Sequence, residues 1–217
     1  MNFKKIILYR EPAISEINID ALVVFLQENF PIKVEIKDNV FKEFSLENIK
    51  KLSNIRITDI KSSFSEHKSS DDEIEFERKL CEDSSLMDST TKVENAQQIS
   101  DVFMYDGFEL QKILRYLSED SETLHIILTN RLTCTFDEND NRYHGRAVIC
   151  ANPSIISTTG IVEAPAKPKE YYFEVMKLKT QGLDIKSAKE KYKGKFLEYN
   201  DKRLTKILEG YILQVIF

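Results

Sequence analysis

The sequence predicts an α/β fold: an N-terminal strand–helix–strand unit and a mixed sheet that includes a hairpin, flanked by helices, with a helical C-terminal region. Three observations carry this prediction. Residues 5–37 alternate between strand-like and helix-like apolar spacing, residues 124–129 form a dense apolar run, and a polar turn at 137–141 separates two strand-like segments. Apolar spacing of two residues is typical of strands, and spacing of three or four residues is typical of helices.

The first 40 residues fit a βαβ unit. Residues 5–9 form a short apolar run that predicts a buried strand, and Asn18 is placed to cap the helix that follows. The apolar stripe of this helix consists of Leu22, Phe25, Leu26 and Phe30. Pro31 ends the helix, and alternation over residues 32–36 predicts a strand with one solvated face.

Less regular segments follow. Ser45 begins a predicted short helix that runs to about Leu52, and the isoleucines between residues 55 and 60 predict a third strand. Residues 61–100 are rich in serine and acidic residues, with ten acidic against five basic side chains. Such a composition buries too little apolar surface to offset chain entropy, so we expect a mobile insert, in which only residues 73–80 look helical.

Regular structure is expected again from Asp106, which has capping-box spacing with Glu109. The helix that follows should cover a sheet whose centre is the run 124–129. The segments 132–136 and 143–150 flank the polar turn as the strands of a hairpin would.

The C-terminal third is predicted to be mostly helical. Residues 151–167 are rich in Ser, Thr, Gly and Pro and favour an irregular ordered loop. Pro168 suits the first turn of a helix to about Thr180, with Gly182 as its stop. A last helix, from residue 200 or 201, carries no C-terminal cap. We therefore expect either that its apolar end is buried or that the natural domain continues past Phe217, and this helix is the candidate for self-association.

As a whole, the chain reads as one domain in three parts. Residues 1–60 are the N-terminal βαβ part of the core, 61–100 the acidic serine-rich insert, and 101–217 the remainder of the core with the C-terminal helices.

Composition excludes several classes of function. The net charge of −5 predicts no nucleic-acid partner, since phosphates require a concentrated basic surface. No apolar run reaches about 18 residues, so we expect no membrane partner and a cytoplasmic location. The three cysteines, Cys81, Cys134 and Cys150, are odd in number and lack CxxC spacing, which argues against a disulfide framework or a thiolate metal site.

The candidate site lies in the predicted hairpin and the loop after it. His144 enters its strand from an acidic turn, and an imidazole near carboxylates can bind a metal or transfer protons near neutral pH. The alternative is a half-exposed strand histidine bonded to Asp137 or Glu138.

Two further residues are candidates. Glu163 lies in a loop stiffened by Pro165 and could act as a base or a ligand; the alternative is an ion pair with Arg146 or Lys167. His125 opens a strand and has a structural explanation as well. His67 falls in the insert, where no fixed geometry is expected.

Standard catalytic signatures are absent from the sequence. The six glycines form neither a GxGxxG nor a Walker pattern, which excludes nucleotide binding by that route. No HExxH pair and no GxSxG elbow occur.

Three segments resemble an uncharacterised archaeal family described as metallopeptidases, which is itself distantly similar to archaemetzincins. They are Leu124–Arg131, the pair Tyr143–His144, and the run Pro153–Tyr172, which reads PSIISTTGIVEAPAKPKEYY; the opening KIILYREP also looks like the first strand of that family. The likeness covers most of residues 1–60 and 105–217. The extended His-Glu helix and cysteine segment of archaemetzincins have no counterpart here.

The sequence leaves two functions open, of which the resemblance implies the first. In the first, the chain is a zinc metallopeptidase-like protein with an incomplete motif, in which His144 binds zinc, His125 supplies a second ligand and Glu163 acts on the water that attacks a peptide. In the second, it is a non-catalytic module that binds a peptide or protein through the loop 152–167 and the last helix.

Overall fold

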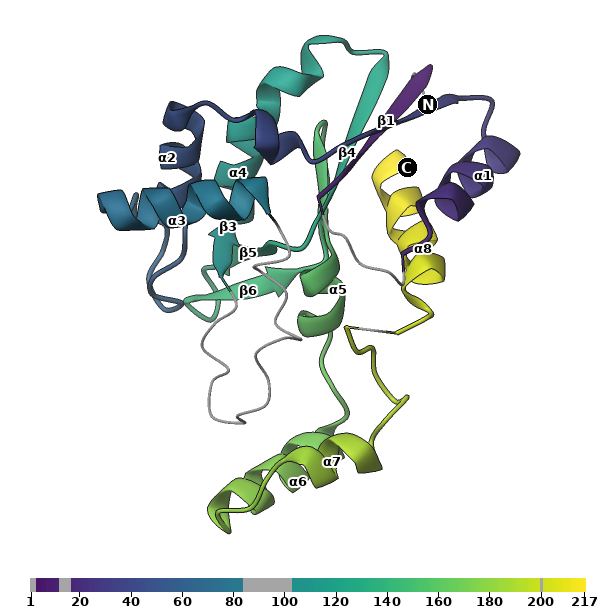
Figure 1. Ribbon diagram of the computed structural model, residues 1–217. Coiled ribbons are helices and arrows are strands. Elements are labelled where there is room, and N and C mark those ends of the chain that lie inside the picture. The colour runs from purple at the N-terminus through teal and green to yellow at the C-terminus, as the bar shows by residue number, and fades with distance from the viewer. Residues whose placement is uncertain (1–2, 12–16, 84–102, 200) are drawn as a thin grey trace.

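The computed structural model describes residues 3–11, 17–83, 103–199 and 201–217, and it confirms a mixed α/β fold (Figure 1). Its main sheet has the strand order β2-β1-β4-β8-β7. These strands are β1 (Lys5–Arg10), β2 (Lys33–Lys37), β4 (Thr123–Thr129), β7 (Val148–Ile149) and β8 (Ser154–Ser157). All neighbours pair in parallel except β7 and β8, which are antiparallel.

The centre of this sheet lies where the densest apolar runs are. Every residue of β4 is buried, and β1 is buried from Ile6 to Tyr9. A strand shielded on both faces is expected to be mainly apolar, as Ile6–Tyr9 of β1 and Ile126–Leu128 of β4 are. By contrast, β2 lies at the edge of the sheet, as its sequence predicts; Lys33, Ile36 and Lys37 are exposed and Val34 and Glu35 are half-buried.

One face of the sheet is covered by the first and last helices, α1 (Ile19–Asn29) and α8 (Leu204–Ile216). The Asn18 side chain accepts a hydrogen bond from the amide of Ala21, which confirms the predicted cap. The buried apolar side chains of α8, which pack in the same core cluster as those of α1, are Leu204, Leu208, Ile212 and Ile216.

The other face is covered by the 3₁₀ helix η1 (Val40–Glu43), α2 (Leu46–Asn54) and α4 (Gly107–Leu114), which continues into η5 (Arg115–Glu119). Ser45 caps α2 and Asp106 caps α4, both as predicted. In place of the strand expected at residues 55–60, the chain makes a single bridge between Arg56 and Tyr105.

A helix packed on the core also forms within the predicted insert. The segment α3 (Asp71–Glu82) contains the helical piece expected at 73–80, but it is held firmly, since Glu77, Leu80 and Cys81 are all buried. Ser70 and Glu73 form a complete capping box at its start. Residues 84–100 of the insert, together with residues 101 and 102, lie outside the described residues.

A second sheet of three strands carries the hairpin. β3 (Met104–Asp106) pairs in parallel with β5 (Leu132–Asp137), and β5 pairs antiparallel with β6 (Arg142–Arg146). The hairpin predicted around the turn 137–141 is therefore confirmed, but its second strand ends at Arg146 and not at residue 150, since Val148–Ile149 form β7 of the main sheet. Asn141 has a φ of 52° in that turn, a conformation that Asn tolerates better than most residues.

Residues 151–167 were expected to form an irregular loop, and this prediction was wrong for their middle part. Ile155 and Ile156 place β8 between β4 and β7, and α5 (Thr158–Glu163) follows directly. Ser157 caps α5 by accepting a hydrogen bond from the amide of Gly160. Side-chain hydroxyls that suggest a loop are thus used here for capping and for bonds to neighbouring carbonyls.

The helices α6 (Lys169–Thr180) and α7 (Lys186–Lys191) form a small unit with its own core and stand apart from the sheets (Figure 1). Gly182 has a φ of 68° just after α6, which confirms its predicted role as a stop. Within the described residues, no helix combines the length and the hydrophobicity needed to cross a membrane.

Candidate metal centre

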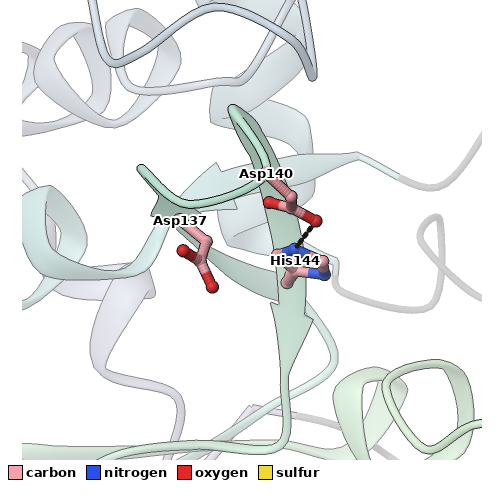
Figure 2. A group of neighbouring side chains, drawn as sticks. All are labelled: Asp137, Asp140 and His144. Atoms are coloured by element: carbon pink, nitrogen blue, oxygen red, sulfur yellow. Dashed lines mark hydrogen bonds and ion pairs between the residues drawn. The ribbon is translucent and has the colours of Figure 1, made fainter.

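Three potential metal ligands converge at the turn of the β5–β6 hairpin. Asp137 ends β5, Asp140 lies in the turn and His144 lies in β6 (Figure 2). One ligand atom from each lies within 4.8 Å of the others. Among the residues that the structure describes, this is the one group of three or more His, Cys, Asp or Glu side chains found with such spacing.

His144 points toward the turn and is paired with an acid. Its Nε2 lies 2.7 Å from Oδ2 of Asp140, and the two side chains are 32% and 46% exposed. The sequence suggested Asp137 or Glu138 as a hydrogen-bonding partner of a structural histidine at this position. The partner is Asp140 instead, because the tight turn brings the side chain of Asp140 next to that of His144, four residues later.

Asp137 is held in place by its own turn. Its Oδ1 accepts hydrogen bonds of 2.9 Å from both the backbone amide and the side-chain amide of Asn139. These bonds, with smaller contributions from His144 and Arg146, hold the pKa of Asp137 below its usual range. The group is therefore an ionised carboxylate at neutral pH, which is the form that binds a cation.

The donor set fits a divalent cation. Carboxylates are hard ligands and an imidazole is a borderline one, and such a mixed set suits zinc or manganese. Two ligand atoms on a tetrahedral zinc lie roughly 3.3 Å apart. The 2.7 Å contact between His144 and Asp140 would therefore have to open slightly, while the 4.8 Å limit on the group as a whole is compatible with a shared ion.

Glu163, predicted from the sequence to be a base or a ligand, is the last residue of α5. Its Oε1 accepts a 2.7 Å hydrogen bond from the hydroxyl of Tyr199, and its Oε2 lies 3.5 Å from Nζ of Lys167. The ion pair with Lys167 that the sequence allowed therefore forms. Arg146, the other predicted partner, donates to Oγ1 of Thr135.

Helix α5 packs closely on β6. A Cβ placed at Gly145 would lie 3.7 Å from Cβ of Ala164, and a Cβ placed at Gly160 would lie only 2.0 Å from the carbonyl oxygen of Arg146. Gly145 and Ala164 are therefore in contact. Gly145 follows His144 in the sequence, and Ala164 follows Glu163.

His125, the second predicted ligand, lies in β4 of the other sheet and is buried. Its Nδ1 is 3.0 Å from the hydroxyl of Tyr9, and the two rings stack with centroids 5.8 Å apart. Burial, followed by the positive charge of Lys37, lowers the pKa of His125. The group of three ligands around His144 does not include it.

The carboxyl ends of β1 and β4 hold a buried network of charges. Arg131 lies 3.2 Å from a carboxylate oxygen of Glu11 and 3.2 Å from one of Glu77, and all three side chains are fully shielded from solvent. Thr129 also donates a hydrogen bond to Glu11. Ligands often bind at this edge of an open α/β sheet, but here it is filled by ion pairs between parts of the protein itself.

The two aspartates were missed as ligands in the sequence. Their spacing, Asp-x-x-Asp-x-x-x-His, spans a predicted turn between two strands. In an antiparallel hairpin the residues on either side of the turn come together, so this spacing was an available signal. It is a weak one, because acidic residues are also common in turns for their own hydrogen bonding.

The sequence matches one family model, described as "Probable metallopeptidase family (DUF6775)", over residues 2–217. No curated protein and no solved structure matches the chain.

Proposed function

The chain belongs to this probable metallopeptidase family, whose model matches nearly its whole length, and on that premise we propose that it is a zinc-dependent hydrolase of peptide bonds. The metal ligands that we propose are Asp137, Asp140 and His144. One observation carries this assignment: an imidazole and two carboxylates from one hairpin have their ligand atoms within 4.8 Å of one another.

The three side chains suit this role in charge and in access. Two carboxylates offset the charge of a divalent cation, and the side chain of His144 is partly exposed, so its imidazole is accessible to an ion from solvent. Zinc held there would supply Lewis acidity to a bound water or to a peptide carbonyl. Because Asp140 is exposed and the other two ligands are half-buried, a peptide could approach from solvent.

We propose Glu163 as the general base. It ends α5, and Ala164, which follows it, packs on Gly145 of β6, the residue after His144. The carboxylate of Glu163 accepts a hydrogen bond of 2.7 Å from the hydroxyl of Tyr199. A carboxylate oriented by a second side chain is the arrangement expected of a group that takes a proton from water.

A second assignment keeps the ligand pair predicted from the sequence, His144 with His125. It requires His125 to exchange its contact with Tyr9 for the metal. Replacing His125 would then lower metal affinity as much as replacing His144 does. If the ligands are Asp137, Asp140 and His144, replacing His125 should leave metal affinity unchanged.

The alternative function is a non-catalytic module that binds a peptide or protein. The observation in its favour is that both oxygens of Glu163 are engaged, by Tyr199 and by Lys167, as those of a purely structural carboxylate would be.

Hydrolysis of a mixed peptide library, followed by mass spectrometry, separates the two functions. We expect cleavage by zinc-loaded protein, loss of cleavage on chelation, and recovery when zinc is restored. Asp140→Asn should abolish cleavage, and Asp184→Asn, at an exposed aspartate paired with Lys186, should leave it unchanged. Cleavage that survives chelation would contradict a metal-dependent mechanism, and intact peptides with zinc-loaded protein would favour the binding module.

A further inference from the structure

The outer face of α6 exposes three large apolar side chains. Tyr172, Phe173 and Met176 are 49%, 59% and 65% exposed. The opposite side of the helix, with Tyr171 and Leu178, is buried against α7 and its flanking residues. At 100° per residue the three exposed side chains fall within an arc of roughly 100°, so they form a single apolar stripe, which we call the α6 stripe.

Lysines border this stripe on both sides. Lys177 and Lys179 are exposed on opposite flanks of it, and Nζ of Lys169 lies 5.6 Å from the ring centroid of Phe173. Of the two acidic residues of the helix, Glu174 is paired with Lys191 of α7 at 3.2 Å, and Glu170 is exposed in the first turn. The C-terminal segment 167–217 as a whole carries twelve basic and seven acidic residues, against the net negative charge of the full chain.

The position of α6 leaves the stripe accessible. Helices α6 and α7 share a small core of their own and stand away from the two sheets (Figure 1). The stripe lies on the side of α6 that is turned away from its contacts with α7. A broad, flat partner could therefore contact the whole stripe without displacing the rest of the protein.

The kind of charge indicates the partner. Each basic residue beside the stripe is a lysine, whereas recognition of defined carboxylates in protein interfaces favours the planar fork of arginine. Lysine acts as a point charge in a diffuse field, and its long stem lets the ammonium group reach outward while apolar neighbours are buried. An apolar stripe with lysines along both edges is typical of helices that lie in the surface of an anionic bilayer.

We propose that α6 docks on an anionic phospholipid surface, with the α6 stripe inserted among the headgroups and the three lysines against the phosphates. The sequence predicted no membrane partner because no segment is long enough to span a bilayer, but a helix that lies on the surface does not need to span it. This association is independent of the metal site and of hydrolysis.

Sedimentation with lipid vesicles tests the proposal on the full chain. We expect binding to vesicles that contain one third phosphatidylserine, weakening with added salt, and no binding to vesicles of phosphatidylcholine alone. The double variant Phe173→Ser, Met176→Ser should bind at least about tenfold more weakly, because each lost side chain removes a buried apolar contact. The matched control is Phe108→Ser, at another apolar residue that is 55% exposed, and it should bind like the unaltered protein.

A second pair of variants isolates the charges. Lys177→Gln with Lys179→Gln should weaken vesicle binding by about fivefold per lysine, and Lys50→Gln with Lys68→Gln, at exposed lysines elsewhere, should not. The proposal is overturned if phosphatidylserine vesicles are not bound, or if the serine variants bind them normally. It is also overturned if soluble polyglutamate binds the stripe as tightly as the vesicles do, or if the protein self-associates through the stripe, since either result identifies a protein partner.

Discussion

Nη1 of Arg131 lies 3.2 Å from Oε1 of Glu77, and neither side chain has any exposed surface. Glu77 comes from α3 and is also bonded by Arg56, while Arg131 follows β4 and also contacts Glu11. This ion pair therefore connects α3, a helix of the predicted insert, to the residues that follow the central strand β4.

Replacing Glu77 should destabilise the protein strongly. In Glu77→Gln the charges of Arg131 and Arg56 lose a buried partner, and breaking such a pair on one side costs about 3–5 kcal/mol. Urea unfolding of the variant measures this loss. The control is Glu75→Gln, which removes an exposed ion pair with Arg78 and should cost under about 1 kcal/mol. Similar losses in the two variants would contradict the role given to the buried pair.

His125 should make stability depend on pH. Its pKa is lowered in the folded protein, whereas the unfolded chain takes up a proton near pH 6.5. The unfolded state thus binds the proton first as the pH falls, so the stability due to neutral His125 is complete above about pH 6.5 and is lost below it. Unfolding free energies at pH 8 and pH 5.5 should differ less in His125→Gln than in the unaltered protein. Equal differences in the two proteins would contradict the burial argument.

The packing of α5 on β6 should tolerate no side chain at Gly160. A Cβ there would lie 2.0 Å from the backbone oxygen of Arg146, so Gly160→Ala must move the helix that carries Glu163. We expect a loss of about 1–3 kcal/mol, measured by thermal unfolding. Gly210→Ala, in α8 with no atom within 4 Å of the added Cβ, should instead raise stability by about 0.5–1 kcal/mol. A neutral Gly160→Ala would mean that α5 is not held against β6.

Glu163→Gln separates catalysis from metal binding. If Glu163 takes the proton from water, the variant should keep its zinc and lose about 100-fold or more in peptide hydrolysis. Glu174→Gln, at a partly buried glutamate that is also paired with a lysine, should keep full activity. If Glu163→Gln does not bind zinc, Glu163 is a metal ligand. If the variant hydrolyses peptides at the normal rate, Glu163 has only a structural role.

Local patterns predicted much of the fold. The caps at Asn18, Ser45 and Asp106 act over two or three residues, and all three form as the spacing indicates. The hairpin turn and the buried run of β4 are likewise defined by adjacent residues. Such features depend on short-range hydrogen bonding and on the period of apolar residues, both of which a sequence displays directly.

Other features depend on partners that are distant in the sequence. Helix α3 has few apolar residues, and besides Leu80 and Cys81 it buries Glu77, whose ion pair with Arg131 no local pattern reveals. Strand β8 and helix α5 were predicted as an irregular loop because their serines and threonines are common in loops. In the fold these hydroxyls instead bond to backbone groups, as when Thr158 donates to the carbonyl of Thr129 and Thr159 to that of Asn130.

The candidate site was predicted in part. His144 was selected for its position after an acidic turn, and it is the one predicted metal ligand that belongs to the three-residue group. Asp137 and Asp140 were not selected, since turn composition alone does not show which carboxylates face the strand histidine. The roles given to His125 and Glu163, and the three-part division of the chain, stay predictions.

Zinc binding by the hairpin is the central claim, and isothermal titration calorimetry of chelator-treated protein tests it most directly. His67 provides a matched control, since its side chain is 31% exposed and its Nε2 lies 3.0 Å from Glu73, much as His144 is 32% exposed and bonded to Asp140. We expect one zinc per chain in the unaltered protein and in His67→Gln, and no saturable binding in His144→Gln. Equal zinc binding by the two variants, or none by the unaltered protein, would contradict the proposed metal centre.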